Sequence, residues 1–289
     1  MAAYLVSVLN GLAMGSLLFA IALGLSLVFG MMDVLNLAHG AIYLVGAYLA
    51  VAFAGDGASV TAFVLAVLLA AGAGAVLGGL LAGLARATPH HLDQALLTLG
   101  VSLVVAETLS AVFGDDVHSI AAPAPGGVTV FGETYPVYRL LVIGFGLVLA
   151  AGVYVLVERS RLGALIRATV ADRGMVSALG VNTGRVLAGV FAAGAGLAAV
   201  AGVLAGPILG AQPGLDEKVL LLALVVVVIG GLGSVRGALL GAVLIGQVQA
   251  LGTALLPEYA SFLIFAAMGL VLLLRPAGLL PARAAAVQA

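Results

Sequence analysis

The 289-residue sequence contains no cysteine, and only 8% of its residues are charged. Without cysteine the chain can form neither a disulfide framework nor a thiolate metal site. Its four histidines show no metal-ligand spacing with carboxylates, such as H-E-x-x-H, so no metal or other cofactor is expected. A Ser-His-Asp signature and a G-x-x-x-x-G-K-[ST] loop are also absent, which predicts that this chain is not an enzyme and does not hydrolyse nucleotide.

The shortage of charge restricts the environment in which the chain can fold. A soluble domain carries about 25% charged residues, whereas 64% of this chain is hydrophobic and its mean hydropathy is +1.30. So few charges cannot cover a surface that faces water, so the chain is predicted to lie in a lipid bilayer. The net charge is −1, and no basic patch suited to nucleic acid is present. We therefore expect a multi-pass protein of the plasma or inner membrane.

A membrane-spanning helix needs roughly 20 apolar residues, and the sequence offers several such stretches. They are 4–30, 40–54, 60–84, 96–113, 137–157, 186–209, 219–249 and 260–274. The sequence GGLGSVRG at 230–237 interrupts one of them, which gives about nine spans if that stretch forms two helices and eight if it forms one span and a re-entrant piece. The first Arg is Arg86, so the first stretch is expected to be a retained helix rather than a signal peptide. The prediction is one all-α polytopic domain over 1–289 with broken or re-entrant segments, and a turn or small hairpin within 114–136.

The charges predict the orientation of these spans, because Lys and Arg gather on the cytoplasmic side of membrane proteins. If the spans alternate, one side receives Arg86, the arginines of the central polar stretch, Arg275 and Arg283. The opposite side receives a set of acidic residues, Asp56, Asp115, Asp116, Glu133, Asp216, Glu217 and Glu258. This distribution predicts that the N-terminus lies outside and that the C-terminus is cytoplasmic.

The long polar interruption at 159–184 is the central stretch of the chain. Together with Arg185 it contains an arginine group, Arg159, Arg161, Arg167, Arg173 and Arg185. Apolar residues and a threonine recur with the spacing of one helix face at Leu162, Leu165, Ile166 and Thr169. Gly174 is expected to interrupt this helix, and Gly180 is expected to end a second short one. Such a charged helix–break–helix docks onto a soluble partner or lies on lipid headgroups as an interfacial loop.

Polar residues and glycine-rich breaks inside the spans are candidates for a substrate path, since polar groups in lipid are costly and usually face a cavity or another helix. The candidates are Asn36, His39, Gly40, Glu107, Gly230, Gly231, Gly233 and Ser234. Asn36 and His39 share a helix face, and they either line the path or cap the second helix and hold its break. Glu107 is the one carboxylate well inside a span and is expected to pair with a group such as Gln247 or Gln249, or to lie near water. Asp33 lies at a span end and is expected to be interfacial.

Several ordered motifs resemble one known family. They are Asn10-Gly11, Gly15-Ser16, Ala22-Leu23-Gly24-Leu25, Phe29-Gly30, Asn36, Ala38-His39-Gly40 and Tyr43 in the first part, then Ala178-Leu179-Gly180-Val181-Asn182, Gly230-Gly231-Leu232-Gly233-Ser234, Gly237-Ala238 and Arg275-Pro276-Ala277-Gly278-Leu279. In this order they are similar to the LivH-type permeases of branched-chain amino acid ABC importers. The resemblance covers almost the whole chain, and the loop 115–135 carries no matching motif.

The resemblance implies a translocation subunit that works by alternating access driven by ATP. Its partners would be a second, related or identical permease subunit, two cytoplasmic ATPase subunits and an extracytoplasmic substrate-binding protein. The family's ATPase-coupling region is carried over onto this chain at Asp172, Arg173, Met175, Ala178, Leu179, Gly180 and Asn182. The substrates implied are branched-chain amino acids, or related amino acids, urea or amides.

Two other classes of transport protein remain as alternatives. A secondary transporter would couple the substrate to an ion gradient and would need intramembrane carboxylates, of which Glu107 is the one candidate. A passive channel for a small polar solute would use the glycine-rich breaks as filter loops.

Overall fold

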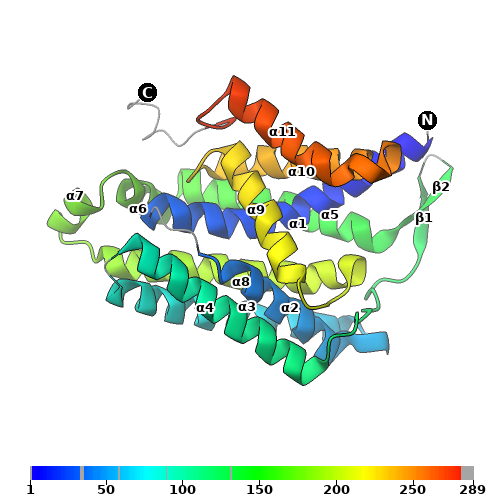
Figure 1. Cartoon of the computed structure of the whole chain (residues 1–289), viewed down its shortest axis with the longest axis horizontal. Helices are drawn as coiled ribbons and strands as arrows, with labels where there is room; N and C mark the ends of the chain where they lie inside the picture. Colours follow the sequence, from blue (N-terminus) through cyan, green and yellow to red (C-terminus); the bar gives the residue numbers. More distant parts are fainter. Residues whose placement is uncertain (1, 33–35, 58, 89, 131, 281–289) are drawn as a thin grey trace.

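The computed structural model describes residues 2–32, 36–57, 59–88, 90–130 and 132–280. Nine longer helices of the described residues form a bundle (Figure 1). They are α1 (Ala2–Met32), α2 (His39–Ala54), α3 (Val60–Ala87), α4 (His91–Phe113), α5 (Val137–Val153), α8 (Thr183–Leu209), α9 (Leu215–Gly230), α10 (Val235–Leu255) and α11 (Ala260–Leu274). A π-helical turn (Tyr154–Arg159) leads from α5 into the short helices α6 (Arg161–Ala171) and α7 (Arg173–Ala178). Short 3₁₀ turns lie at Gly55–Gly57 and Pro257–Tyr259.

Seven helices in the described part of the chain are long and apolar enough to cross a membrane. They are α1, α3, α4, α5 with its π-helical turn, α8, α10 and α11 with the preceding 3₁₀ turn. The all-α membrane architecture is therefore confirmed, and seven of the expected eight or nine segments reach the length of a full span in the described residues. The difference comes from α2 and α9, which have 16 residues each. Sixteen residues of α-helix are about 24 Å long, shorter than the roughly 30 Å hydrocarbon core.

The core of the bundle forms where α1 and α8 pack against α2, α3, α9 and α10. Small residues allow backbones to approach closely at these crossings. A Cβ added at Gly46 of α2 would lie 1.8 Å from the carbonyl oxygen of Ala199 in α8, and one at Gly202 would lie 2.0 Å from that of Tyr43. By contrast, Gly79 of α3 faces open space. The glycine-rich composition thus serves helix packing at particular crossings and not at every glycine.

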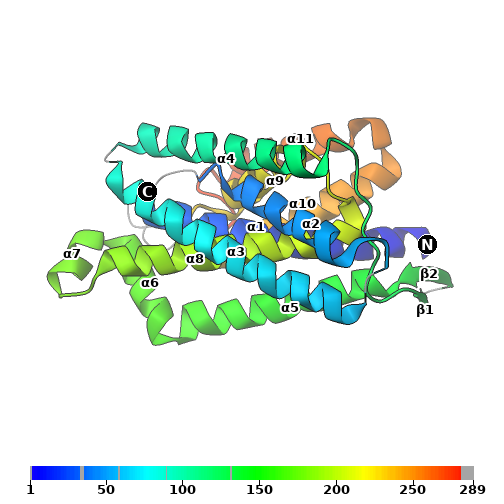
Figure 2. The same cartoon turned by 90° about the horizontal axis from the view of Figure 1, so that it is seen from below.

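The hairpin expected within 114–136 is confirmed. Strands β1 (Gly127–Val130) and β2 (Glu133–Pro136) pair antiparallel, with Gly127 opposite Pro136 and Val130 opposite Glu133. Figure 2 shows this hairpin and the N-terminus at one end of the bundle and α6 and α7 at the other. We call these the hairpin end and the arginine-rich end.

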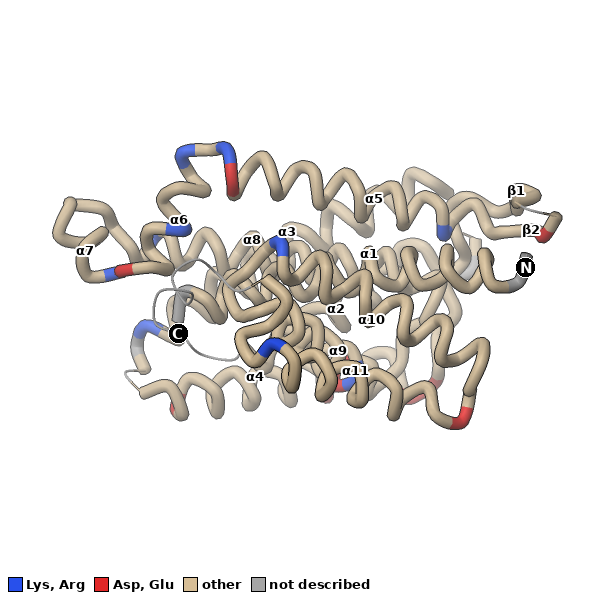
Figure 3. The backbone as a smooth tube through the Cα atoms, turned by 90° about the horizontal axis from the view of Figure 1, so that it is seen from above, with Lys and Arg blue, Asp and Glu red and all other residues tan. Residues whose placement is uncertain are grey.

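Most of the arginines gather at one of these two ends, where Glu158 and Asp172 also lie, so acidic residues occur at both ends (Figure 3). The arginine-rich end takes its name from residues at the end of α3, in the π-helical turn, in α6 and α7, at the start of α8 and α10, and directly after α11: Arg86, Arg159, Arg161, Arg167, Arg173, Arg185, Arg236 and Arg275. The hairpin end holds Asp115, Asp116, Glu133 and Glu258, together with Arg139 near the start of α5. The side chain of Asp56 and the whole of Asp33 and Arg283 lie outside the described residues.

Candidate functional site

Helix α2 begins inside the bundle rather than at its surface. The Nε2 atom of His39 lies 3.0 Å from the carbonyl oxygen of Ile21, which is in the middle of α1. The backbone N–H of Leu37 donates to Thr98 Oγ1 of α4 over 3.2 Å, and the N–H of His39 donates to the carbonyl of Asn36. His39 and Asn36 are both buried, and the side-chain amide of Asn36 has no hydrogen-bond partner among the described residues. The break before α2 is thus held against α1 and α4.

The start of α9 lies beside this break. A Cβ added at Gly40 would come within 2.4 Å of the carbonyl oxygen of Asp216, so only glycine allows this approach. Gly214, with φ of 79°, precedes α9 and takes a left-handed conformation that glycine adopts without strain. Asp216 and Glu217 occupy the first turn of α9, where the helix dipole favours negative charge. The short helices α2 and α9 therefore begin next to each other inside the bundle.

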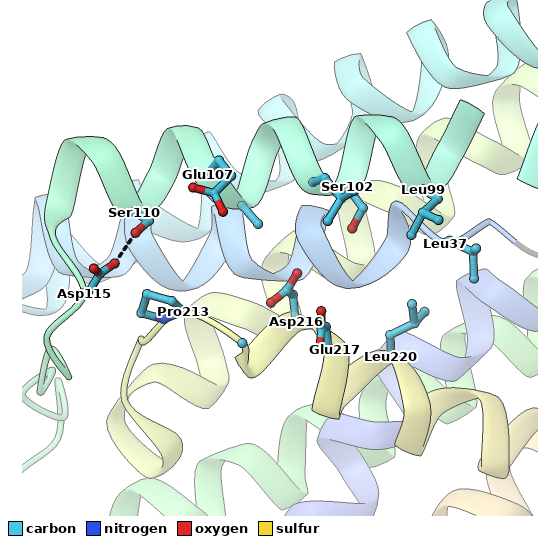
Figure 4. Close-up of a pocket in the computed structure, with 13 residues that line it drawn as sticks. Leu37, Leu99, Ser102, Glu107, Ser110, Asp115, Pro213, Asp216, Glu217 and Leu220 are labelled. Carbon is cyan, nitrogen blue, oxygen red and sulfur yellow. Dashed lines mark hydrogen bonds between the residues drawn. The ribbon is translucent and has the colours of Figure 1, made fainter. Parts of the chain in front are cut away.

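A cavity of about 390 Å³ opens between α4 and α9 at this place (Figure 4). Four carboxylate residues line it: Glu107, Asp115, Asp216 and Glu217. Ser102, Leu37 and Leu220 also line it, and the hydroxyl of Ser110 donates to the carboxylate of Asp115. We call this space the acidic cavity. Four acidic side chains, with no Lys or Arg among the described lining residues, create a negative potential that attracts ammonium groups.

The structure brings some of the predicted path residues together and separates others. Glu107 lines the acidic cavity, while His39 and Gly40 lie next to it through the contacts of α2 with α9. Of the two alternatives expected for Glu107, the structure rules out pairing with Gln247 or Gln249 and places Glu107 at a cavity instead. The amide of Gln247 instead donates to the carbonyl of Val8 over 3.0 Å, and Gln249 lines a different cavity.

The glycine-rich break between α9 and α10 lies at the arginine-rich end, a helix length away from the acidic cavity. It consists of Gly230, Gly231, Gly233 and Ser234, and Ser234 caps α10 by accepting a hydrogen bond from the N–H of Gly237 over 3.0 Å. The chain after α11 packs on it, since the N–H groups of Leu279 and Leu280 donate to Ile229 and Gly230. These residues are therefore not grouped with Asn36, His39 and Glu107.

Asp216, Glu217 and Asp115 belong to the acidic cavity, although sequence reasoning placed them only in loops. One local signal was present, because two carboxylates directly before a long apolar run are typical of a helix start. Their proximity to Glu107 could not be read from local pattern. In the part of the chain that the structure describes, no group of His, Asp and Glu has the arrangement of a metal site.

The central stretch forms α6 and α7, which project from the arginine-rich end (Figure 1). The predicted break at Gly174 is wrong by two residues. Asp172 separates the helices and caps α7, since its carboxylate accepts a hydrogen bond from the N–H of Met175 over 2.8 Å. Gly180 has φ of 85° and follows the end of α7, as predicted. The predicted helix face is correct in part, because Thr169 is buried and Leu162 is exposed.

Helix α7 and Leu179, which directly follows it, display apolar side chains on a segment that is held by polar contacts. Leu179 is 75% exposed and Met175 65% exposed, whereas Val176 is buried. The Nε atom of Arg173 lies 3.5 Å from Thr183 Oγ1. Asn182 caps α8 by accepting from the N–H of Arg185 over 3.0 Å. Of the predicted coupling residues, Asp172 and Asn182 thus shape the segment, and Met175 and Leu179 form its exposed apolar surface.

Comparison with known proteins identifies the family to which this chain belongs. Residues 7–272 match the family described as "Branched-chain amino acid transport system / permease component". The chain belongs to the branched-chain amino acid permease family. It is 30% identical over 295 residues to the high-affinity branched-chain amino acid transport system permease protein BraD of Pseudomonas aeruginosa, with 96% of this chain and 95% of the relative covered. It is 31% identical over 308 residues to the permease protein LivH of Escherichia coli K12 and 30% identical over 298 residues to LivH of Salmonella typhimurium, with the same coverage.

No solved structure matches the chain. The family match confirms the resemblance read from the motifs, and with it the prediction of a transport subunit rather than an enzyme. The long apolar helices and the membrane permease relatives likewise confirm a multi-pass membrane protein. In this permease family member, the acidic cavity and the projecting α6–α7 segment are the two features on which the proposed function below is built.

Proposed function

We propose that this chain is the permease subunit of an ATP-driven ABC importer that moves branched-chain amino acids into the cytoplasm by alternating access. The observation that carries the proposal is the match to the permease family over 7–272, together with relatives whose names state branched-chain amino acid transport. The partners are two ATPase subunits, an extracytoplasmic binding protein and a second, related or identical permease.

The orientation follows from the arginine-rich end, which we place in the cytoplasm by the positive-inside rule. The N-terminus and the β1–β2 hairpin then lie outside, and the C-terminus lies inside. In this orientation α6 and α7 project toward the ATPase subunits, with the exposed Met175 and Leu179 as apolar contacts. An exposed leucine and methionine at a membrane protein's cytoplasmic surface are explained by burial in a partner. The residues 159–184 thus form the coupling segment.

The acidic cavity is proposed as part of the substrate path. An amino acid carries an ammonium group that the four carboxylates attract and an apolar side chain that Leu37 and Leu220 can contact. Glu107 is exposed on α4 within the span. A charged side chain that faces lipid at the centre of a helix costs about 2.5–3.5 kcal/mol or more. We therefore place the second permease subunit over the open side of this cavity, between α4 and α9.

One observation favours a second candidate, a secondary transporter. Four carboxylates around one membrane cavity could bind protons or sodium ions as well as ammonium groups. The two candidates differ in their energy source, which can be measured directly.

Uptake of labelled leucine into proteoliposomes separates the two functions. Vesicles contain the permease with its ATPase and second permease subunits, and substrate-loaded binding protein is added outside. The importer predicts uptake that requires ATP inside and is unchanged by an uncoupler. Uptake that persists without ATP and collapses with the uncoupler would assign the chain to the secondary transporters, and a bidirectional leak would assign it to channels.

His39→Ala is expected to reduce this uptake more than it reduces assembly of the complex. The substitution removes the contact between the start of α2 and the carbonyl of Ile21, while most of the buried helix surface stays in place. His118→Ala is the matched control, because His118 makes the same kind of contact, 3.0 Å from the carbonyl of Phe113, at the hairpin end. Normal uptake by the His39 variant, at equal amounts of purified complex, would assign His39 to helix capping alone.

A further inference from the structure

A second cavity, of about 310 Å³, lies near the hairpin end between α1, α5, α8 and α10. Its polar lining consists of Ser7, Asn10, Arg139, Gln249 and Thr253, with Met14 and Ile208 among its apolar neighbours. It shares no described residue with the acidic cavity, and none of its described lining residues is an aspartate or glutamate. The lining of this second cavity and that of the acidic cavity therefore have opposite charge.

Arg139 gives this second cavity its positive charge. One of its terminal nitrogens, Nη1, donates to the side-chain oxygen of Asn10, and a guanidinium has further N–H donors available. Among the described residues, the one ion pair joins Arg236 to Glu158, so no described carboxylate pairs with Arg139. The charge acts on its surroundings, since burial raises the pKa of Tyr135 and the nearby guanidinium opposes that rise. An arginine in this setting is suited to an oxyanion, with which it forms strong, directional hydrogen bonds.

Gln249 supplies the complementary group. Its side-chain oxygen Oε1 is buried and has no hydrogen-bond partner among the described residues. A buried acceptor without a partner is costly, and a ligand that brings an N–H or O–H group would satisfy it. Thr253 lies one turn further along α10 and donates its own proton to the backbone carbonyl of Gln249 over 2.8 Å. The cavity thus offers donors on the Arg139 side and an acceptor on the α10 side.

We propose that this cavity binds the oxyanion group of a ligand through Arg139 and Asn10, while Gln249 accepts a hydrogen bond from a donor group of the same ligand. Two sources offer this chemistry at the hairpin end. One is a free amino acid, which has a carboxylate and an ammonium group. The other is a membrane phospholipid, which has a phosphate and a headgroup donor. The site does not depend on the importer assignment, because its recognition chemistry is the same for any energy source.

Binding to the purified full-length chain tests the site with two kinds of probe, phospholipid for one source and a free amino acid for the other. Native mass spectrometry measures retention of phosphatidylglycerol and phosphatidylethanolamine, and equilibrium dialysis measures binding of labelled leucine. Arg139→Gln removes the charge and keeps most of the side-chain volume. Lys218→Gln is the control, since Lys218 is an exposed cation that does not line this cavity. Arg139→Gln is expected to weaken the binding of one kind of probe roughly 10- to 100-fold. Lys218→Gln is expected to leave the binding of both kinds unchanged.

The kind of probe whose binding falls in the Arg139→Gln variant identifies the source of the oxyanion. Gln249→Leu serves as a second variant in case Arg139→Gln fails to fold, with the melting temperature as the folding readout, and it should weaken the same probe while the charge remains. Equal binding of both probes by the folded variants and the wild-type chain would overturn the site. Failure of both probes to bind the wild-type chain would overturn it as well.

Discussion

Leu179→Asp is expected to abolish ATP-driven uptake without reducing the amount of permease in the membrane. Leu179 is 75% exposed on the projecting α7 segment, so a charge there disturbs no core packing. In the complex it is expected to be buried against the ATPase, where loss of an anchor residue costs about 2 kcal/mol or more, roughly 30-fold in affinity. Uptake of labelled leucine should fall to background, and the ATPase should no longer respond to substrate-loaded binding protein.

Leu92→Asp is the matched control for this variant. Leu92 is also an exposed leucine, at the start of α4 and therefore at the same end of the molecule, but it lies outside α6 and α7. The control should keep its uptake and its coupled ATPase activity. If Leu179→Asp transports as well as the wild-type complex, α7 is not the ATPase contact.

Blocking Ser102 chemically is expected to stop transport in a complex that is already folded. The chain contains no cysteine, so Ser102→Cys introduces a unique thiol of similar size into the wall of the acidic cavity. A small thiol reagent then adds bulk where the substrate is proposed to pass. If that overpacking costs the occupied state about 1–3 kcal/mol, uptake falls roughly 5- to 150-fold after labelling. Excess substrate should slow the labelling.

Val104→Cys provides the comparison on the same helix. Val104 is exposed on α4, two residues away, and does not line the acidic cavity. Labelling at this position should leave most of the uptake intact. Full activity of completely labelled Ser102→Cys complex would remove the acidic cavity from the substrate path.

The long apolar runs predicted the membrane class and most helices, because hydrophobic length is a local property of the sequence. The number of full spans could not be predicted in the same way. Whether α2 begins at the membrane surface or inside the bundle depends on the contact of His39 with Ile21, which joins residues far apart in the chain. The same is true of α9, whose start is placed by Asp216 against Gly40.

Patterns in the local sequence also predicted the wrong boundary between α6 and α7. They further grouped residues that lie far apart in the structure. A glycine was expected to break the central stretch, but the capping carboxylate of Asp172 sets the break, and Gly174 lies inside α7. The polar break before α2 and the glycine-rich break before α10 were both expected on the substrate path, yet the first lies beside the acidic cavity and the second at the arginine-rich end. Glu107 was identified as unusual from its position in an apolar run. Its neighbours Asp216 and Glu217 come from another helix and required the folded structure.

The central claim is that the arginine-rich end faces the cytoplasm and presents α7 to the ATPase. The most direct test uses single cysteines in this cysteine-free chain, Leu179→Cys at the arginine-rich end and Glu258→Cys at the hairpin end, with a membrane-impermeant maleimide. In intact cells or spheroplasts the reagent should label the cysteine at 258 and leave the one at 179 unmodified until the membrane is permeabilised. Labelling of the cysteine at 179 from outside intact membranes would contradict the account, since α7 would then lie on the side opposite the ATPase.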